Sequence, residues 1–137
     1  KGLIFLEAVH TPKHFYEGRA KHIFDLSYIR GKKVILLSSI GDPLYFEDTA
    51  GDLGANIIEH IKFPDHHDYR RRDMDHVIRR CNERNFDLVL TTEKDIVKLN
   101  RLGLNLAPYT VLTLAVEMKI TAGSEILIDR LHSLYIS

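Results

Sequence analysis

VILLSSIGDP, Val34–Pro43, is the stretch that decides the fold. Its first half is a short run of β-branched and leucine residues, which is typical of a strand buried on both faces of a sheet. Its second half predicts the start of a helix, because Asp42 is a suitable N-cap and Pro43 is favoured at the first helical position. That helix is predicted to run to Leu53 and to stop at Gly54.

The same alternation of strand and helix continues along the chain. Buried strands are predicted at Val34–Ser39, Asn56–Phe63, Leu88–Thr92 and Thr110–Val116, with Leu3–Val9 as a fifth candidate. Further helices are predicted at Arg71–Glu83, Glu93–Asn100 and Ser124–Leu134. The segment Thr11–Lys33 has no clean period and is predicted to be a long connection with a short helix near Ala20–Leu26. This order predicts a three-layer α/β/α fold with a mostly parallel, Rossmann-like sheet.

Length and composition exclude several classes of protein. The 137 residues fit one domain, and the formal net charge of zero argues against a dedicated nucleic-acid binder. Cys81 is the single cysteine, so no internal disulfide can form. No apolar run approaches the ~20 residues of a membrane-spanning helix. The chain begins at Lys1, inside an apolar run, and we interpret it as a piece of a longer protein.

Three loops with titratable residues follow three of the predicted strands. They contain Ser38–Pro43, Phe63–Tyr69 and Thr91–Asp95. Because ligands approach the carboxyl ends of parallel strands, we expect these loops to lie along one edge and to form a site.

The loop FPDHHDY, Phe63–Tyr69, allows three interpretations. Adjacent histidines seldom bind one metal ion, and no Cys or His set elsewhere completes a zinc site. The second interpretation is a structural turn, in which the Asp65 carboxylate accepts hydrogen bonds from the backbone amides of the following residues. A catalytic or substrate-side histidine is the third, because a neighbouring carboxylate can tune or orient imidazole for proton transfer.

The segment TTEKDIVK, Thr91–Lys98, predicts a capped helix start. Thr92 can cap the helix, and the acidic residues Glu93 and Asp95 suit its positive end. Lys94 can form a row with Lys98 one turn later. Capping of a solvent-exposed helix explains part of this pattern on structural grounds alone, with no functional role.

Two other features remain open between structure and function. Gly41 suits a tight turn more often than a phosphate contact, and the sequence contains no G-x-x-x-x-G-K-[ST] phosphate loop. The arginines Arg70, Arg71, Arg72, Arg79 and Arg80 form either a solvated face or a contact for phosphate or anionic lipid.

Taken in order, these motifs resemble the tetraacyldisaccharide 4'-kinases of lipid A biosynthesis. That family carries a GIGNP turn, then FPDHHxY, then TEKDxVK. The corresponding residues here are Ile40–Pro43, Phe63–His67 with Tyr69, and Thr92–Asp95 with Val97 and Lys98. Ser39 replaces the first glycine of the turn, Asp42 replaces asparagine, and Arg70 follows the tyrosine where a small polar residue is common.

The resemblance implies an activity and a place for each motif. The family enzyme is a Gram-negative transferase that moves the γ-phosphate of ATP to the 4'-hydroxyl of tetraacyldisaccharide 1-phosphate, using Mg²⁺, at the cytoplasmic face of the inner membrane. Its phosphate loop and catalytic aspartate lie in an amino-terminal lobe. On this basis His66 is the catalytic histidine, supported by Asp65, His67 and Tyr69. An interlobe cleft is predicted at Thr92, Glu93, Lys94 and Asp95, and a turn near the site at Gly41 and Asp42.

The resemblance also predicts a division of the chain. Residues 1–32 would be a strand and linker region that joins a phosphate-loop lobe, and residues 33–137 the carboxyl-terminal lobe. The chain alone would lack kinase activity, because ATP and Mg²⁺ are expected mainly on the other lobe. The expected partners are that lobe, the lipid A precursor and the inner-membrane surface, with no nucleic acid and no metal held by this chain itself.

Two alternatives remain. An Asp-His-His phosphoesterase would use manganese, but its upstream D-x-D and downstream glycine-rich histidine motifs are absent here. A non-catalytic anion- or lipid-binding module would use the arginine-rich helix.

Overall fold

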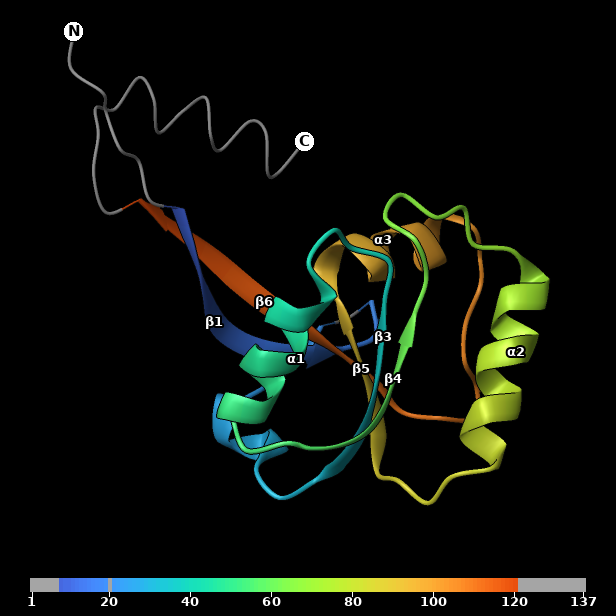
Figure 1. The fold of residues 1–137 in the computed structure, drawn as a ribbon, viewed down its shortest axis with the longest axis horizontal. Coiled ribbons are helices and arrows are strands. Elements are labelled where there is room, and N and C mark those ends of the chain that lie inside the picture. The colour runs from blue at the N-terminus through green and yellow to red at the C-terminus, as the bar shows by residue number, and fades with distance from the viewer. Residues whose placement is uncertain (1–7, 20, 121–137) are drawn as a thin grey trace, which may run out of the picture. The chain divides into compact units, whose positions relative to one another are not determined.

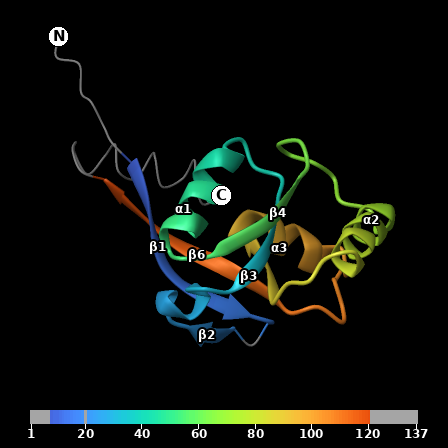
Figure 2. The same cartoon turned by 60° about the horizontal axis from the view of Figure 1, so that its bottom comes forward.

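The computed structural model describes residues 8–19 and 21–120. Within them, one six-stranded sheet has the order β2-β1-β6-β5-β3-β4 (Figures 1 and 2). The strands are β1 (Ala8–Glu17), β2 (His22–Phe24), β3 (Lys33–Ser38), β4 (Asn56–Lys62), β5 (Leu88–Thr92) and β6 (Val111–Ile120). The helices are α1 (Pro43–Asp52), α2 (Arg71–Asn82) and α3 (Glu93–Arg101), with a 3₁₀ turn at Leu26–Ile29.

The predicted α/β fold class is confirmed. β3 pairs in parallel with β4 and β5, and β5 pairs in parallel with β6. Successive side chains of a strand point to opposite faces, so Val34 and Leu36 of β3 join one core and Ile35 and Leu37 the other. The first core includes Phe46 and Ala50 of α1 and Ile29 of the 3₁₀ turn; the second includes Met74, Val77 and Cys81 of α2 and Leu99 of α3. Helices therefore cover both faces of the sheet.

The predicted helix boundaries agree closely with the structure. The Asp42 carboxylate accepts a hydrogen bond from the Tyr45 amide at 3.1 Å, which caps α1 in front of Pro43. Leu53 is the C-cap, and Gly54 follows with φ +98°, a conformation that favours glycine. A Cβ at Gly54 would also lie 3.2 Å from the Arg30 Cα, so the close approach of another segment requires glycine there.

The prediction for Thr11–Lys33 was wrong. Instead of a long connection with a short helix, β1 continues to Glu17 and forms an antiparallel pair with β2, with Phe15 opposite Phe24. β2 lies within the predicted helix Ala20–Leu26, and the 3₁₀ turn begins at Leu26, where that helix was predicted to end. The cause is nonlocal pairing: β2 has only three residues, too few to show a period, and it is held by its partner strand.

Contacts divide the chain into two compact units. His14–Ala115 form one, and the described residues 8–13 and 116–120 belong to the other. All side chains of the candidate site lie in the first unit. The predicted helix Ser124–Leu134 and residues 3–7 of the predicted strand Leu3–Val9 lie outside the described residues. In the described part of the chain, no helix combines the length and hydrophobicity needed to span a membrane.

Candidate functional site

The three predicted loops meet at the carboxyl edge of the sheet, as expected. They are residues 39–42 after β3, residues 63–70 after β4, and the junction of β5 with α3. The chain leaves β3 toward β4 on one side and leaves β5 toward β6 on the other. The ends of β3 and β5 therefore form the topological switch point where ligands bind in open α/β sheets.

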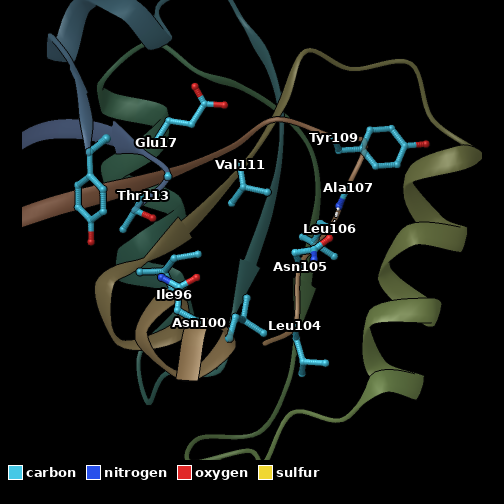
Figure 3. Close-up of a pocket in the computed structure, with 13 residues that line it drawn as sticks. Glu17, Ile96, Asn100, Leu104, Asn105, Leu106, Ala107, Tyr109, Val111 and Thr113 are labelled. Atoms are coloured by element: carbon cyan, nitrogen blue, oxygen red, sulfur yellow. Dashed lines mark hydrogen bonds between the residues drawn. The ribbon is translucent and has the colours of Figure 1, made fainter. Parts of the chain in front are cut away.

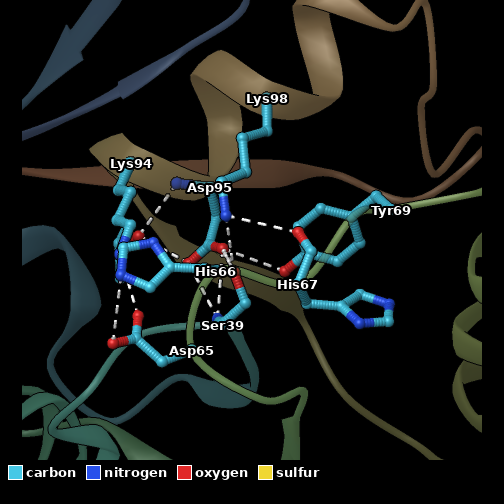
Figure 4. A network of polar contacts seen from close by, with 9 residues as sticks. Ser39, Asp65, His66, His67, Tyr69, Lys94, Asp95 and Lys98 are labelled. Carbon is cyan, nitrogen blue, oxygen red and sulfur yellow. Dashed lines mark hydrogen bonds and ion pairs between the residues drawn. The ribbon is translucent and has the colours of Figure 1, made fainter.

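The carboxylate of Asp95 occupies this point and is fully buried (Figure 4). The Ser39 amide donates to both of its oxygens at 3.1 Å, and the Ser39 hydroxyl donates to Oδ1 at 2.5 Å. The hydroxyls of Tyr69 and Thr92 donate to the same carboxylate at 2.9 and 2.6 Å. Because burying a charge is costly unless it is hydrogen-bonded, this set of donors is what stabilises Asp95 in the core.

Thr92 and Tyr69, which both donate to Asp95, are fixed by their local structure. Thr92 is the N-cap of α3, and its Oγ1 accepts from the Asp95 amide at 3.1 Å, as the sequence predicted. Burial, followed by the negative charge of Asp95, raises the pKa of Tyr69. The Tyr69 hydroxyl therefore stays protonated at neutral pH and acts as a donor.

Lys98 joins the same network from the next turn of α3. Its Nζ lies 3.4 Å from Ser39 Oγ and 3.3 Å from the carbonyl oxygen of His67. Lys98 therefore holds the β3 loop and the β4 loop together, and it places a positive charge near buried Asp95 through the shared Ser39 hydroxyl (Figure 4).

His66 points outward from the loop that this hydrogen-bond network holds. Its side chain is 80% exposed, and its Nε2 lies 3.6 Å from Asp65 Oδ2. Its φ of +61° is uncommon for a residue other than glycine, and such conformations persist where the surroundings impose them. Asp65, the residue before it, is held by Lys94 Nζ at 2.9 Å. The hydrogen bond from Lys94 lowers the pKa of Asp65.

His67 faces the opposite way and packs in the protein. Its ring stacks on Phe63 at 4.7 Å between centroids, and its Nε2 lies 3.0 Å from Asp73 Oδ2. The Arg70 amide donates to the same oxygen at 2.8 Å, which closes the amino end of α2. Partial burial acts to raise the pKa of Asp73, but the His67 and Arg70 hydrogen bonds together with the positive charges of His67 and Arg72 outweigh it, and the pKa is lowered. The two histidines thus have different environments.

The remaining predicted residues lie around this centre. Gly41 permits a close approach, since a Cβ there would lie 3.2 Å from Asp65 Oδ2. Asp42 is exposed and caps α1. Burial raises the pKa of Tyr16, and the negative charge of Glu93 raises it further. One electrostatic partner of Glu93 is therefore on β1. Among residues 8–19 and 21–120, no cluster of three or more His, Cys, Asp or Glu side chains could hold a metal ion.

Sequence reasoning missed several members of the site. Ser39 was placed in the loop after the first predicted strand and Lys98 in a row with Lys94, but neither was predicted to contact a buried carboxylate network, as both do. A second, partly buried network was also not predicted: His60 Nε2 lies 2.7 Å from Ser38 Oγ, and its Nδ1 lies 2.7 Å from Glu47 Oε2. A polar residue on each of three neighbouring elements was its only signal.

A separate hollow of about 340 Å³ lies between the start of β6, α3 and the end of β1 (Figure 3). Its lining includes Ile96, Leu104 and Val111 together with Asn100 and Asn105. It contains none of the predicted site residues, so it is distinct from the edge where the three loops meet.

Comparison with known proteins identifies the family. The family model described as tetraacyldisaccharide-1-P 4'-kinase, LpxK, matches residues 4–134. The chain belongs to the LpxK family. Tetraacyldisaccharide 4'-kinase of Syntrophus aciditrophicus is 34% identical over 69% of the chain and 25% of that protein. The enzyme of Elusimicrobium minutum is 32% identical over 88% of the chain and 31% of that protein.

A solved structure of the same family shares the fold. LpxK from Aquifex aeolicus, solved as an "apo" form in complex with ATP, matches with a TM-score of 0.53 and 20% identity. The match covers 94% of this chain and 35% of that one. The chain thus spans about a quarter to a third of the length of these LpxK relatives.

Proposed function

We propose that this chain is the carboxyl-terminal lobe of a kinase that transfers the γ-phosphate of ATP to the 4'-hydroxyl of tetraacyldisaccharide 1-phosphate in lipid A biosynthesis. Membership of the LpxK family supports the reaction class. The enzyme would act on its lipid substrate at the cytoplasmic face of the inner membrane of a Gram-negative bacterium. Residues 1–32 would link this lobe to an amino-terminal lobe with a phosphate loop.

The observation that carries this proposal is the presentation of His66. The residues on either side of it are fixed, Asp65 by Lys94 and the His67 carbonyl by Lys98, while the imidazole itself is 80% exposed. A histidine that served only the local fold would gain by packing, as His67 does. An exposed imidazole on a loop fixed at both sides is what we expect of a histidine that forms a site together with residues of another lobe.

The chemistry assigned to this chain is positioning and proton handling at His66. A phosphoryl-transfer site needs a carboxylate that accepts the proton of the attacking hydroxyl. Either ring nitrogen of His66 can donate to such a carboxylate on the amino-terminal lobe, which orients it and sets its pKa.

ATP and Mg²⁺ would supply the transferred phosphoryl group and its charge neutralisation. The described residues of this chain do not fit a Mg²⁺ site, because no carboxylate cluster lies at the loop edge. The sequence also contains no phosphate loop. We therefore assign both ligands to the amino-terminal lobe, and we expect no kinase activity from the 137-residue chain alone.

The test is the steady-state kinetics of the full-length enzyme that contains this chain. His66→Ala should lower kcat by about 10²-fold or more, the usual contribution of a positioned acid–base group, while ATP binding stays the same. His76→Ala, at another exposed histidine on α2, is the matched control and should retain wild-type kcat. Near-normal turnover of His66→Ala would remove the catalytic assignment.

No observation favours the two alternatives. A metal-dependent phosphoester hydrolase would show stoichiometric manganese or zinc in the purified protein, whereas this proposal predicts none bound by this chain. For the anion-binding module, Arg80 and Arg84 already contact the Glu59 carboxylate at 2.5 and 3.0 Å. Binding to anionic vesicles that survives charge reversal of Arg71 and Arg79 would argue against that module.

A further inference from the structure

Asp95 has no exposed surface, although it lies directly beneath the loop that carries His66. Burying a carboxylate costs desolvation free energy that an apolar side chain of similar size would not. Its hydrogen bonds reach three separate segments: Ser39 after β3, Tyr69 after β4, and Thr92 at the end of β5. Asp95 thus connects all three loops through one group.

The same helix also holds both sides of His66. Lys94, next to Asp95, holds the Asp65 side chain, and Lys98, one turn later, holds the His67 carbonyl. Tyr69, two residues after His67, also ties the loop to α3: its hydroxyl donates to Asp95, and only 4% of its surface is exposed. The backbone at His66 is therefore supported from α3 on both sides (Figure 4).

We propose that Asp95 is a positioning residue for His66. It does not contact substrate; it fixes Tyr69 and Ser39 so that the loop holds the His66 imidazole in the orientation needed for catalysis. This inference rests on the proposed function. Misplacement of a reacting group by about 1 Å can lower a rate 10²-fold, so a contact below the loop can control turnover without altering ligand binding.

The role predicts a particular pattern in a double-mutant cycle on the full-length enzyme. Tyr69→Phe removes the hydroxyl but keeps the ring, and it should lower kcat about 10-fold with the KM for ATP unchanged. In a His66→Ala background the same substitution should change kcat less than about 2-fold, because no imidazole remains to be positioned. Asp95→Asn should follow the same pattern with a larger single effect.

Controls separate positioning from general destabilisation. Tyr109→Phe removes a hydroxyl that bonds Asn82 on α2, away from the loop, and should leave kcat unchanged. If Asp95→Asn does not fold, Tyr69→Phe and Ser39→Ala carry the test, with thermal unfolding showing that the assayed protein is native.

The outcomes separate the proposed function from the positioning role of Asp95. A normal kcat for His66→Ala would reject the proposed function, and this inference with it. A reduced kcat for His66→Ala, combined with a normal kcat for folded Tyr69→Phe, would reject the positioning role alone. Equal fold-losses for Tyr69→Phe with and without His66 would also reject it, since they would show that the hydroxyl acts independently of the imidazole.

Discussion

The hydroxyl of Tyr69 should contribute measurably to the stability of the 137-residue chain. Tyr69→Phe leaves the ring in place, where it packs edge-on against Phe63 and His67 at 5.4 Å between centroids. What is lost is one 2.9 Å hydrogen bond to the buried Asp95 carboxylate. Hydrogen bonds to charged groups contribute about 1.5–3 kcal/mol, and Asp95 keeps its donors on Ser39 and Thr92.

We therefore expect Tyr69→Phe to lower the free energy of unfolding by about 2 kcal/mol. With a urea m-value of about 2 kcal/mol/M, the midpoint should fall by about 1 M. The assay is urea unfolding followed by far-ultraviolet circular dichroism at pH 7.5. Tyr109→Phe is the matched control, because its hydroxyl bonds a neutral, exposed Asn82 and its loss should cost about 1 kcal/mol or less.

The pH dependence provides a second check on the same variant. The folded pKa of Tyr69 is raised above its ordinary value of 10.0, so its stabilisation is complete below pH 10 and is lost as pH rises further. The difference in stability between wild type and Tyr69→Phe should therefore narrow above pH 10. Equal midpoints for Tyr69→Phe and Tyr109→Phe at pH 7.5 would refute the role assigned to the Asp95 contact.

Two further predictions concern other parts of the fold. Burial, opposed by the hydrogen bond to Glu47, lowers the pKa of His60 below 6.5, so wild type should lose stability as pH falls below that value. In His60→Gln this loss, at most about 1.4 kcal/mol per pH unit, should be absent from urea titrations between pH 6.5 and 5, and an unchanged slope would contradict the assignment. Gly54→Ala should lower the unfolding free energy by more than about 1 kcal/mol, because φ is +98° and the new Cβ meets Arg30. Gly51→Ala, inside α1, should instead raise the unfolding free energy by about 0.5–1 kcal/mol, because beyond the adjoining helix backbone nothing lies within 4 Å of the new Cβ. The same sign for both substitutions would be inconsistent with these backbone conformations.

Local sequence signals predicted the parallel part of the fold well. Leu88–Thr92 forms β5 with the predicted bounds, and Pro43 and Gly54 mark the limits of α1 as expected. These elements carry their own signals, namely a buried apolar run, an N-cap and a glycine after the C-cap. The pair β1 and β2 was missed because its stability comes from pairing between strands, which a three-residue segment cannot reveal.

The site was predicted at the level of loops but not of contacts. Parallel strands place their carboxyl ends at one edge, so the convergence of the three loops followed from strand order. The central contact joins Ser39 to Asp95, which are 56 positions apart, and no local pattern indicates it. Asp95 was interpreted as an acid suited to a helix amino terminus and, from the family resemblance, as part of an interlobe cleft, whereas the structure buries its carboxylate under the loops. The exposure of His66 beside packed His67 likewise depends on tertiary structure.

The most direct test of the central claim is a crystal structure of the full-length enzyme with a non-hydrolysable ATP analogue and Mg²⁺. We predict that the His66 imidazole lies within hydrogen-bonding distance of a carboxylate contributed from outside residues 1–137. We also expect Tyr69, Asp95 and Ser39 to keep the contacts described above. A nucleotide complex in which His66 faces solvent, with no such carboxylate near either ring nitrogen, would contradict this claim.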